Sequence, residues 1–146
     1  ETIGEDRLFV AFPKDDPRDP PAEIPPAMID EGRLMLLEDG HCLKDHALAA
    51  CNRPEMRASA TMIGTSLHTL VQMVAADLGL TYLPAMAEGS SLLEGTGIET
   101  HVLDNKSYRD IGLVWREGSA RAAEFREFGQ LINDCRPPGV IDLPKR

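Results

Sequence analysis

One stretch limits what this chain can fold into and do, because a cysteine stands where a helix should begin. The apolar run at 34–37 is typical of a buried strand. Asp39-Gly40 follows as a turn signal, and the apolar spacing beyond Cys42 predicts a helix. The first turn of a helix has unpaired N–H groups and the positive end of the helix dipole, which favour a thiolate over a thiol. The placement of Cys42 therefore indicates a reactive cysteine.

The charged neighbours of Cys42 act in opposite directions. His41 and Lys44 offer a polarisable ring and a positive charge. Three carboxylates oppose them, those of Glu38, Asp39 and Asp45. The sequence leaves the net effect on the thiol open.

A second cysteine, Cys51, lies nine residues after Cys42. On one unbroken helix that separation corresponds to about 900° of rotation and about 13–14 Å of rise. A disulfide needs Cα atoms about 4.4–6.8 Å apart. If the two cysteines pair, the helix between them must unwind, so the bond would be a conformational switch and not a static cross-link.

Two other interpretations of these residues stay open. Free cysteines are often small buried apolar residues. Alternatively, Cys42 and His46 share a helical face, with His41 and Cys51 nearby, and zinc takes thiolate and imidazole ligands. No CxxC or HxxxH pair occurs in the chain, so we expect no metal site.

The cysteine stretch resembles the OxyR-type, peroxide-sensing members of the LysR-type transcription regulators. In that group a cysteine follows a Gly-His pair and a second lies nine residues later, as Gly40-His41-Cys42 and Cys51 do here. The segments at 64–85 and 108–116 are also similar, and the resemblance runs from about Arg7 to about Ile132. The segment at 64–85 is common to LysR-type regulators generally, whereas the Gly-His-Cys stretch is the specific part.

The resemblance implies a role for each matched residue. Cys42 would be the thiolate that hydrogen peroxide oxidises to a sulfenic acid, and Cys51 would resolve that acid to a disulfide. Four residues would support the site: His41, Lys44, Asp45 and Arg109. Lys44 departs from the arginine expected there, since lysine keeps the charge but lacks the planar fork that makes two parallel hydrogen bonds.

The same resemblance implies the partners. They are hydrogen peroxide, a cellular thiol reductant of the glutaredoxin or thioredoxin type, and further copies of the chain. No cofactor is expected. DNA would be bound only through an N-terminal domain outside this stretch.

Strands that alternate with helices predict an α/β fold with a mixed sheet. By resemblance, the architecture is the periplasmic-binding-protein-like effector-binding domain of LysR-type regulators. Residues 8–109 would form its second subdomain, and 110–133 would return to the first and supply its C-terminal strand and helix. We expect residues 1–146 to be a partial regulatory domain, with the DNA-binding domain and the front of the first subdomain absent.

Apolar periodicity predicts the remaining elements. The expected strands are 8–12, 80–83, 98–103 and 111–115. The clearest helix is 67–78, with Thr65 or Ser66 as cap and Gly79 at its end, and a second helix begins at the cap Ser119 and runs to 132.

Other segments are predicted to contain no reactive or ligand-binding residues. The proline-rich segment at 14–33 is predicted to be a connector with one helical turn at 27–30. The segment at 52–60 is the candidate mobile end of the switch. His68, His101 and Cys135 are expected at the surface.

Charge and hydropathy exclude several functions. Net charge is −9, with 24 acidic against 15 basic residues, and such a surface repels nucleic-acid phosphates. No run of 18 apolar residues occurs, so no membrane span is expected. Three cysteines make an odd number, which is unusual for a static disulfide framework and fits a cytoplasmic protein with a transient disulfide.

The sequence therefore predicts a peroxide-responsive regulatory domain that switches through Cys42 and Cys51. One alternative is a metabolite-binding module of the LysR type, in which Thr65 and Ser66 hold an anion at a helix start. Another is a thiol peroxidase. No second catalytic constellation accompanies Cys42 in the sequence, so we do not expect an enzyme.

Overall fold

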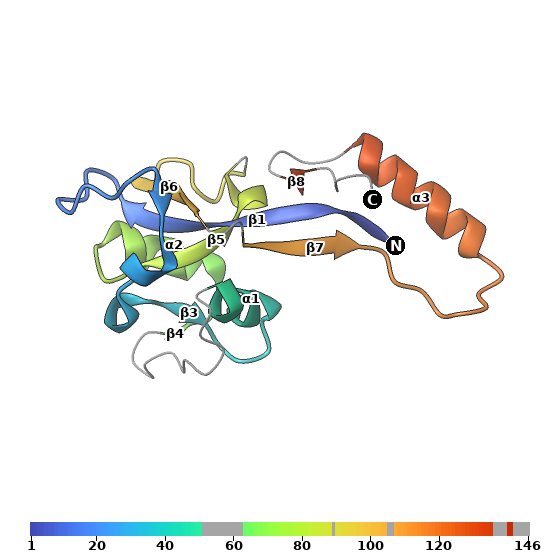
Figure 1. The fold of residues 1–146 in the computed structure, drawn as a ribbon, viewed down its shortest axis with the longest axis horizontal. Coiled ribbons are helices and arrows are strands. Elements are labelled where there is room, and N and C mark those ends of the chain that lie inside the picture. Colours follow the sequence, from blue (N-terminus) through green and yellow to red (C-terminus); the bar gives the residue numbers. More distant parts are fainter. Residues whose placement is uncertain (51–62, 89, 105–106, 136–139, 142–146) are drawn as a thin grey trace.

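The computed structural model describes residues 1–50, 63–88, 90–104, 107–135 and 140–141. One long strand, β1 (Thr2–Pro13), connects a rounded part of the molecule to an extended arm (Figure 1). The second half of β1 lies between β5 (Thr81–Pro84) and β6 (Ile98–Leu103), antiparallel to both. Its first half pairs with β7 (Tyr108–Gly112) and β8 (Val140–Ile141), again antiparallel. The single strand β1 therefore fixes both halves of the sheet.

Parallel pairs complete the sheets. β2 (Glu23–Ile24) pairs parallel with β6, which makes the main sheet mixed, as predicted. β3 (Leu36–Leu37) and β4 (Ile63–Gly64) form a separate parallel pair. Each of these two strands leads toward a helix, α1 (Cys42–Ala50) after β3 and α2 (Leu67–Ala75) after β4.

The helices cover different parts of the sheet. α2 packs on β1, β3 and β5, while α1 lies against β3 and β7. α3 (Ala122–Asp134) lies beside β1 in the arm (Figure 1). In the described segments, the 3₁₀ turns are η1 (Pro26–Met28), η2 (Glu31–Arg33) and η3 (Ala85–Ala87). None of the helices among the described residues has the length and apolar composition that crossing a bilayer requires.

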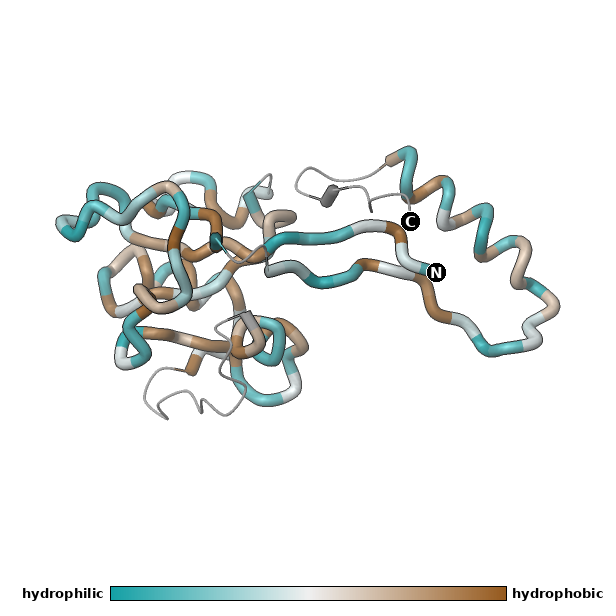
Figure 2. Tube along the Cα trace, in the orientation of Figure 1, coloured by the Kyte–Doolittle hydropathy of each residue, from teal (hydrophilic) through white to brown (hydrophobic). Residues whose placement is uncertain are grey.

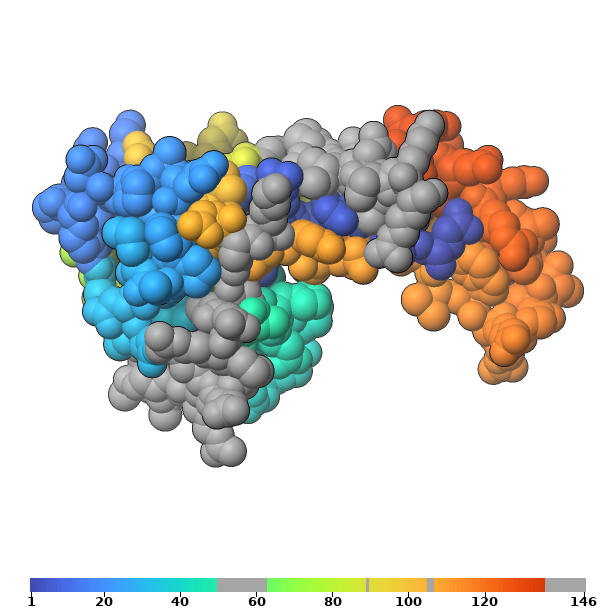
Figure 3. All heavy atoms as spheres, in the orientation of Figure 1, coloured from blue at the N-terminus to red at the C-terminus, as the bar shows by residue number. Residues whose placement is uncertain are grey.

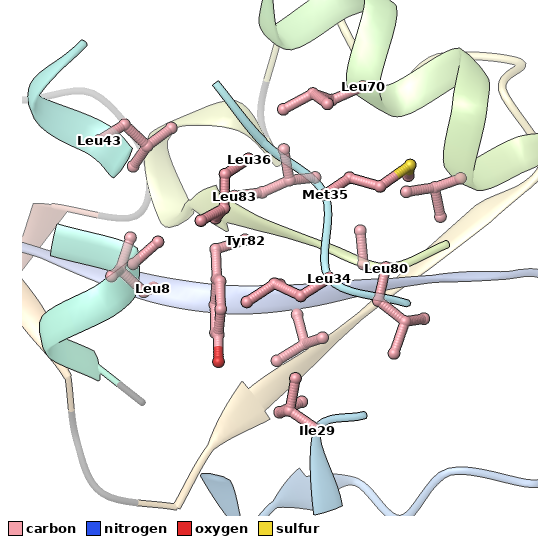
Figure 4. Packing of buried hydrophobic residues seen from close by; sticks show 14 of the residues in the cluster. Leu8, Ile29, Leu34, Met35, Leu36, Leu43, Leu70, Leu80, Tyr82 and Leu83 are labelled. Atoms are coloured by element: carbon pink, nitrogen blue, oxygen red, sulfur yellow. The ribbon is translucent and has the colours of Figure 1, made fainter. Parts of the chain in front are cut away.

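The hydrophobic core lies in the rounded part. It joins Leu8 and Val10 of β1 to Tyr82 and Leu83 of β5, all almost fully buried. Figure 4 shows Leu36 and Met35 reaching this cluster from the β3 segment, Leu70 from α2 and Leu43 from α1. Figure 2 shows hydrophobic residues gathered in the rounded part of the molecule. Burial of these side chains, at about 25 cal/mol per Å² of apolar area, is the main force that holds α1 and α2 in place.

The helix predicted at 67–78 ends three residues early. Ser66 caps its start as expected, since the Ser66 hydroxyl accepts the Thr69 N–H at 3.1 Å. At its end, Asp77 has a left-handed φ of 55°. The N–H of Leu78 donates to the Met73 carbonyl at 3.0 Å and that of Asp77 donates to the Val74 carbonyl at 2.9 Å, a Schellman motif. Leu78 therefore lies beyond the helix and is 53% exposed.

Gly79 has a packing role next to this helix end. A Cβ at Gly79 would lie against the Arg33 carbonyl and 2.8 Å from Met35 Cγ. The absence of a side chain therefore lets the β3 segment pass close to the end of α2. This close approach brings Leu80 into an isolated parallel bridge with Leu34.

The connector and the arm differ from the prediction in detail. The connector contains β2 and two 3₁₀ turns, where one helical turn was expected. The strand predicted at 111–115 is β7, which ends at Gly112, because its partner β1 begins at Thr2, opposite Gly112. Arg109, expected just before the strand, thus lies inside it.

The last helix also begins later than predicted. Ser119 was expected as its cap, but α3 starts at Ala122. The Ser119 hydroxyl instead accepts the Arg121 N–H at 3.3 Å and closes the preceding turn. Phe125 and Ile132 are half-buried, whereas Phe128 and Leu131 remain exposed.

His101 was expected at the surface, and it is only half-buried, but its ring also makes packing contacts. Its ring lies edge-on to Phe12, with centroids 5.2 Å apart, and its Nδ1 is 2.9 Å from the Pro21 carbonyl oxygen. His101 therefore packs the connector onto β6. His68 and Cys135 are exposed, as predicted.

Candidate functional site

Cys42 is the first residue of α1, as the sequence predicted. The turn before it depends on Gly40, whose φ of +97° is a conformation that L side chains rarely adopt. Leu43, Ala47 and Leu48 bury the inner face of α1 in the core. Cys42 is exposed with a free thiol, so its position at the helix start leaves the sulfur open to a reactant from solvent.

Lys44 turns back toward the loop before the helix. Its ammonium group forms an ion pair with the Asp39 carboxylate, and its side chain is only 15% exposed. The stem of Lys44 lies among Leu36, Leu37 and other residues beneath α1. Lys44 therefore stabilises the turn that presents Cys42, and part of its charge is balanced by Asp39.

The other polar residues of the stretch make weaker contacts. His41 Nε2 lies 3.9 Å from a Glu38 carboxylate oxygen, too far for a hydrogen bond, and both side chains are about half exposed. Asp45 is exposed in the first turn of α1, where a carboxylate interacts favourably with the helix dipole. His46 Nδ1 is buried and has no hydrogen-bond partner within the described parts of the chain.

Arg109 is held by a residue that the sequence reasoning missed. Its Nε donates to Asp6 Oδ2 at 2.8 Å, and its second guanidinium contact with the same oxygen is 2.7 Å. Asp6 is completely buried and also accepts the Met86 N–H at 3.0 Å. Because α1 contacts β7, the strand that carries Arg109 lies beside the helix that carries Cys42. The sequence does contain a signal that could have identified Asp6, because this carboxylate stands next to the apolar run at 8–12, on the strand that enters the core.

Thr65 and Ser66 lie close to the cysteine turn. The Glu38 N–H donates to the Gly64 carbonyl at 3.1 Å, which joins the segment before Cys42 to the segment before α2. The parallel strands β3 and β4 therefore end at the same edge of their sheet, and the starts of α1 and α2 follow there. Thr65 and Ser66 are both exposed there, although the Ser66 hydroxyl is already bonded to Thr69. Ligands of α/β folds commonly bind at such a carboxyl edge of parallel strands.

The space around α1 is open on one side. Figure 3 shows a notch beneath β7, between α1 and the segment that leads to α3. Cys51 and the segment at 52–60 lie outside the described residues, so the Cys42–Cys51 pairing stays a prediction. No group of three or more His, Cys, Asp and Glu residues that could hold a metal ion occurs in the described segments.

The sequence was compared with known families and curated proteins. Residues 1–135 match the family model of the LysR substrate binding domain. A probable hydrogen peroxide-inducible genes activator of Streptomyces viridosporus is 37% identical over 125 residues, which are 84% of this chain and 39% of that protein. The DNA-binding transcriptional dual regulator OxyR of Escherichia coli K12 is 34% identical over 119 residues, 82% of this chain and 39% of that protein.

A third relative has a name that does not mention peroxide. The HTH-type transcriptional regulator EstR of Acinetobacter baylyi is 39% identical over 98 residues, 66% of this chain and 33% of that protein. The chain thus spans 33–39% of the length of these three relatives. All three are named as regulators or activators and none as an enzyme.

The fold was compared with solved structures. The reduced regulatory domain of OxyR2 from Vibrio vulnificus superposes with a TM-score of 0.78 at 32% identity and covers 92% of this chain and 63% of that one. A cysteine-to-serine variant of Corynebacterium glutamicum OxyR with bound H2O2 gives a TM-score of 0.79 at 28% identity, covering 91% and 43%. The sequence-based expectation of an α/β regulatory domain is confirmed by these matches.

Proposed function

The chain belongs to the LysR substrate binding domain family, and we propose that within this family it senses hydrogen peroxide by reversible oxidation of Cys42. The observation that carries this proposal is the exposed thiol of Cys42 at the first position of α1, directly after the Gly40 turn. Relatives named as peroxide-inducible activators and structural neighbours that are OxyR regulatory domains support it.

The proposed chemistry has two steps. The Cys42 thiolate attacks one oxygen of hydrogen peroxide and the O–O bond breaks, so Cys42 becomes a sulfenic acid and the hydroxide that leaves takes up a proton to give water. The Cys51 thiol then attacks the Cys42 sulfur, so a second water leaves and a disulfide forms. Two electrons from a thiol reductant of the glutaredoxin or thioredoxin class restore both thiols. His41, Lys44, Asp45 and Arg109 are proposed to support this site.

Disulfide formation would require α1 to change. Ala50 ends α1 eight positions after Cys42, so their Cα atoms are about 12 Å apart along the helix axis. One further residue spans only about 3.8 Å. While α1 persists to Ala50, the Cα of the next residue therefore cannot come within the about 4.4–6.8 Å that a disulfide allows. Oxidation is proposed to unwind the helix, and the resulting cost favours reduction and resetting.

This switch is proposed to act within a larger regulator. Residues 8–109 would form the second subdomain of an effector-binding domain and 110–133 the return to the first. The complete protein would act as a homo-oligomer in the cytoplasm and bind DNA through a separate N-terminal domain.

Mass spectrometry of the intact chain tests the proposal. A few equivalents of hydrogen peroxide should remove two hydrogens from the 42/51 pair, and Cys42→Ser or Cys51→Ser should abolish that change. Cys135→Ser is the matched control, because Cys135 is also exposed with a free thiol but follows α3. If Cys135→Ser alone removed the response, the assignment of Cys42 would be wrong.

A metabolite-binding module is the second candidate. It is favoured by the exposed Thr65 and Ser66 at the carboxyl edge of β3 and β4. A chain that ignores peroxide but binds a small anion, with affinity lost in Thr65→Val, would favour this candidate. Multiple turnovers of peroxide with a thiol reductant would instead indicate a thiol peroxidase.

A further inference from the structure

A pocket lies away from α1, where the connector after β1 folds back on the sheet. It encloses about 200 Å³. Its apolar lining comes from five residues: Phe12, Pro20, Ile24, Met28 and Leu80. Pockets for drug-sized ligands are typically about 300–1,000 Å³, so this pocket suits a molecule of about one ring.

Two arginines and one aspartate provide its charged lining, Arg18, Arg33 and Asp30. The Nη2 atoms of Arg18 and Arg33 lie 3.2 Å and 2.8 Å from the same oxygen, Asp77 Oδ1. Asp77 therefore holds two guanidinium groups next to each other. The Asp30 side chain turns toward the backbone two residues later, where it accepts a hydrogen bond from the Gly32 N–H at 2.9 Å.

Arg18 is further fixed by Asp16. The Arg18 Nε donates to Asp16 Oδ1 at 2.5 Å, and its Nη2 also contacts Asp16 Oδ2. The Asp16 side chain is only 1% exposed, so this pair is anchored in the protein. Across the described residues, Nη1 of Arg18 and both Nε and Nη1 of Arg33 make no hydrogen bond or ion pair. N–H donors thus remain available on both arginines.

The backbone around the arginines is unusual. The non-glycine residues with left-handed φ in the described chain are Asp15 at 60°, Asp19 at 48° and Asp77 at 55°. Two of them flank Arg18, and the third is the shared partner of Arg18 and Arg33. Such conformations persist where surrounding contacts impose them, and they tend to cluster at functional sites.

We propose that this pocket binds a small carboxylic acid with an apolar ring. The ring would lie against Phe12, Ile24, Met28 and Leu80, and the carboxylate would accept hydrogen bonds from Arg18 and Arg33. The planar guanidinium fork matches a carboxylate better than other groups of this size. Asp16 and Asp77 already balance the two positive charges, and Asp30 adds a negative charge to the lining, so binding depends on these hydrogen bonds and on apolar contact and not on a net positive charge. The site shares no residue with the cysteine site, so it stands independently of peroxide sensing.

Isothermal titration of the intact chain with benzoate tests the proposal, with benzamide as a probe of the same shape but without charge. Benzoate should bind at one site and benzamide about 10-fold more weakly or not at all. Arg33→Gln should weaken benzoate binding by about 10-fold or more, whereas Arg116→Gln, an exposed arginine before α3, should leave it unchanged.

A second variant, Met28→Trp, tests the pocket even if Arg33→Gln does not fold. Met28 is 59% exposed, so Met28→Trp can be expected to fold, and its larger side chain should block the pocket and reduce benzoate binding. Equal binding of benzoate by the wild type, Arg33→Gln and Met28→Trp would overturn the proposal. So would the absence of saturable binding up to about 10 mM benzoate.

Discussion

Asp6 and Arg109 face each other across β1 and β7 and form an ion pair in which the carboxylate is fully buried. The pair lies near the inner end of the β1–β7 pairing, just before β1 begins to pair with β5 and β6. Asp6 also binds the Met86 backbone N–H, so one carboxylate joins β1, β7 and η3. This contact fixes the strand that runs beside α1.

Asp6→Asn should destabilise the chain by about 3 kcal/mol, because Arg109, only 19% exposed, would lose its counter-ion while remaining largely buried. Urea unfolding followed by circular dichroism measures the change. Glu5→Gln, on the half-buried neighbouring position of β1, should change the free energy of unfolding by less than about 0.5 kcal/mol. Equal stability of the two variants would refute a structural role for the ion pair.

The sequence predicted Cys42 at the start of α1 correctly because its signals are local: a turn glycine, an apolar strand before it and helical spacing after it. Asp6 was missed because its partners, Arg109 and Met86, are about 80 or more residues away in sequence. The end of β7 was misplaced for a similar reason, since it depends on where β1 begins. The left-handed Asp77 ended α2 before the glycine that the pattern favoured.

Two glycines should respond differently to alanine. At Gly40 a Cβ would meet no atom within 4 Å, so Gly40→Ala should cost only about 1 kcal/mol from the left-handed backbone. At Gly79 the Cβ would collide with the Arg33 backbone and with Met35, and the cost should be about 2 kcal/mol or more. Thermal unfolding of both variants gives the comparison. A larger loss for Gly40→Ala would contradict this account.

Acid should weaken the Asp16–Arg18 pair. Hydrogen bonding to Arg18 lowers the pKa of Asp16 from its ordinary value of 3.8, so the unfolded chain binds more protons than the folded chain below that pH. The stabilisation is present above about pH 4 and is lost as pH falls through the lowered pKa. In Asp16→Asn, the pH dependence of unfolding in this range should be smaller. An unchanged dependence would mean that Asp16 is not a stabilising carboxylate.

The arm should mediate self-association. Val114, Phe128 and Leu131 are large apolar residues that remain exposed on it. Large apolar side chains that remain exposed favour contact with another molecule. Sedimentation should show association that rises with concentration and is reduced in Leu131→Glu. Leu78→Glu, an equally exposed leucine after α2, should have no effect, and a monomeric wild type at high concentration would refute the prediction.

Amide hydrogen exchange across residues 43–50 tests the central claim most directly, because α1 cannot remain intact to Ala50 in a chain with a Cys42–Cys51 disulfide. The reduced and peroxide-oxidised chains would be compared after mass spectrometry has confirmed the disulfide. The proposed switch predicts protected amides in the reduced chain and a marked loss of protection after oxidation. Unchanged protection across 43–50 with the disulfide in place would contradict it.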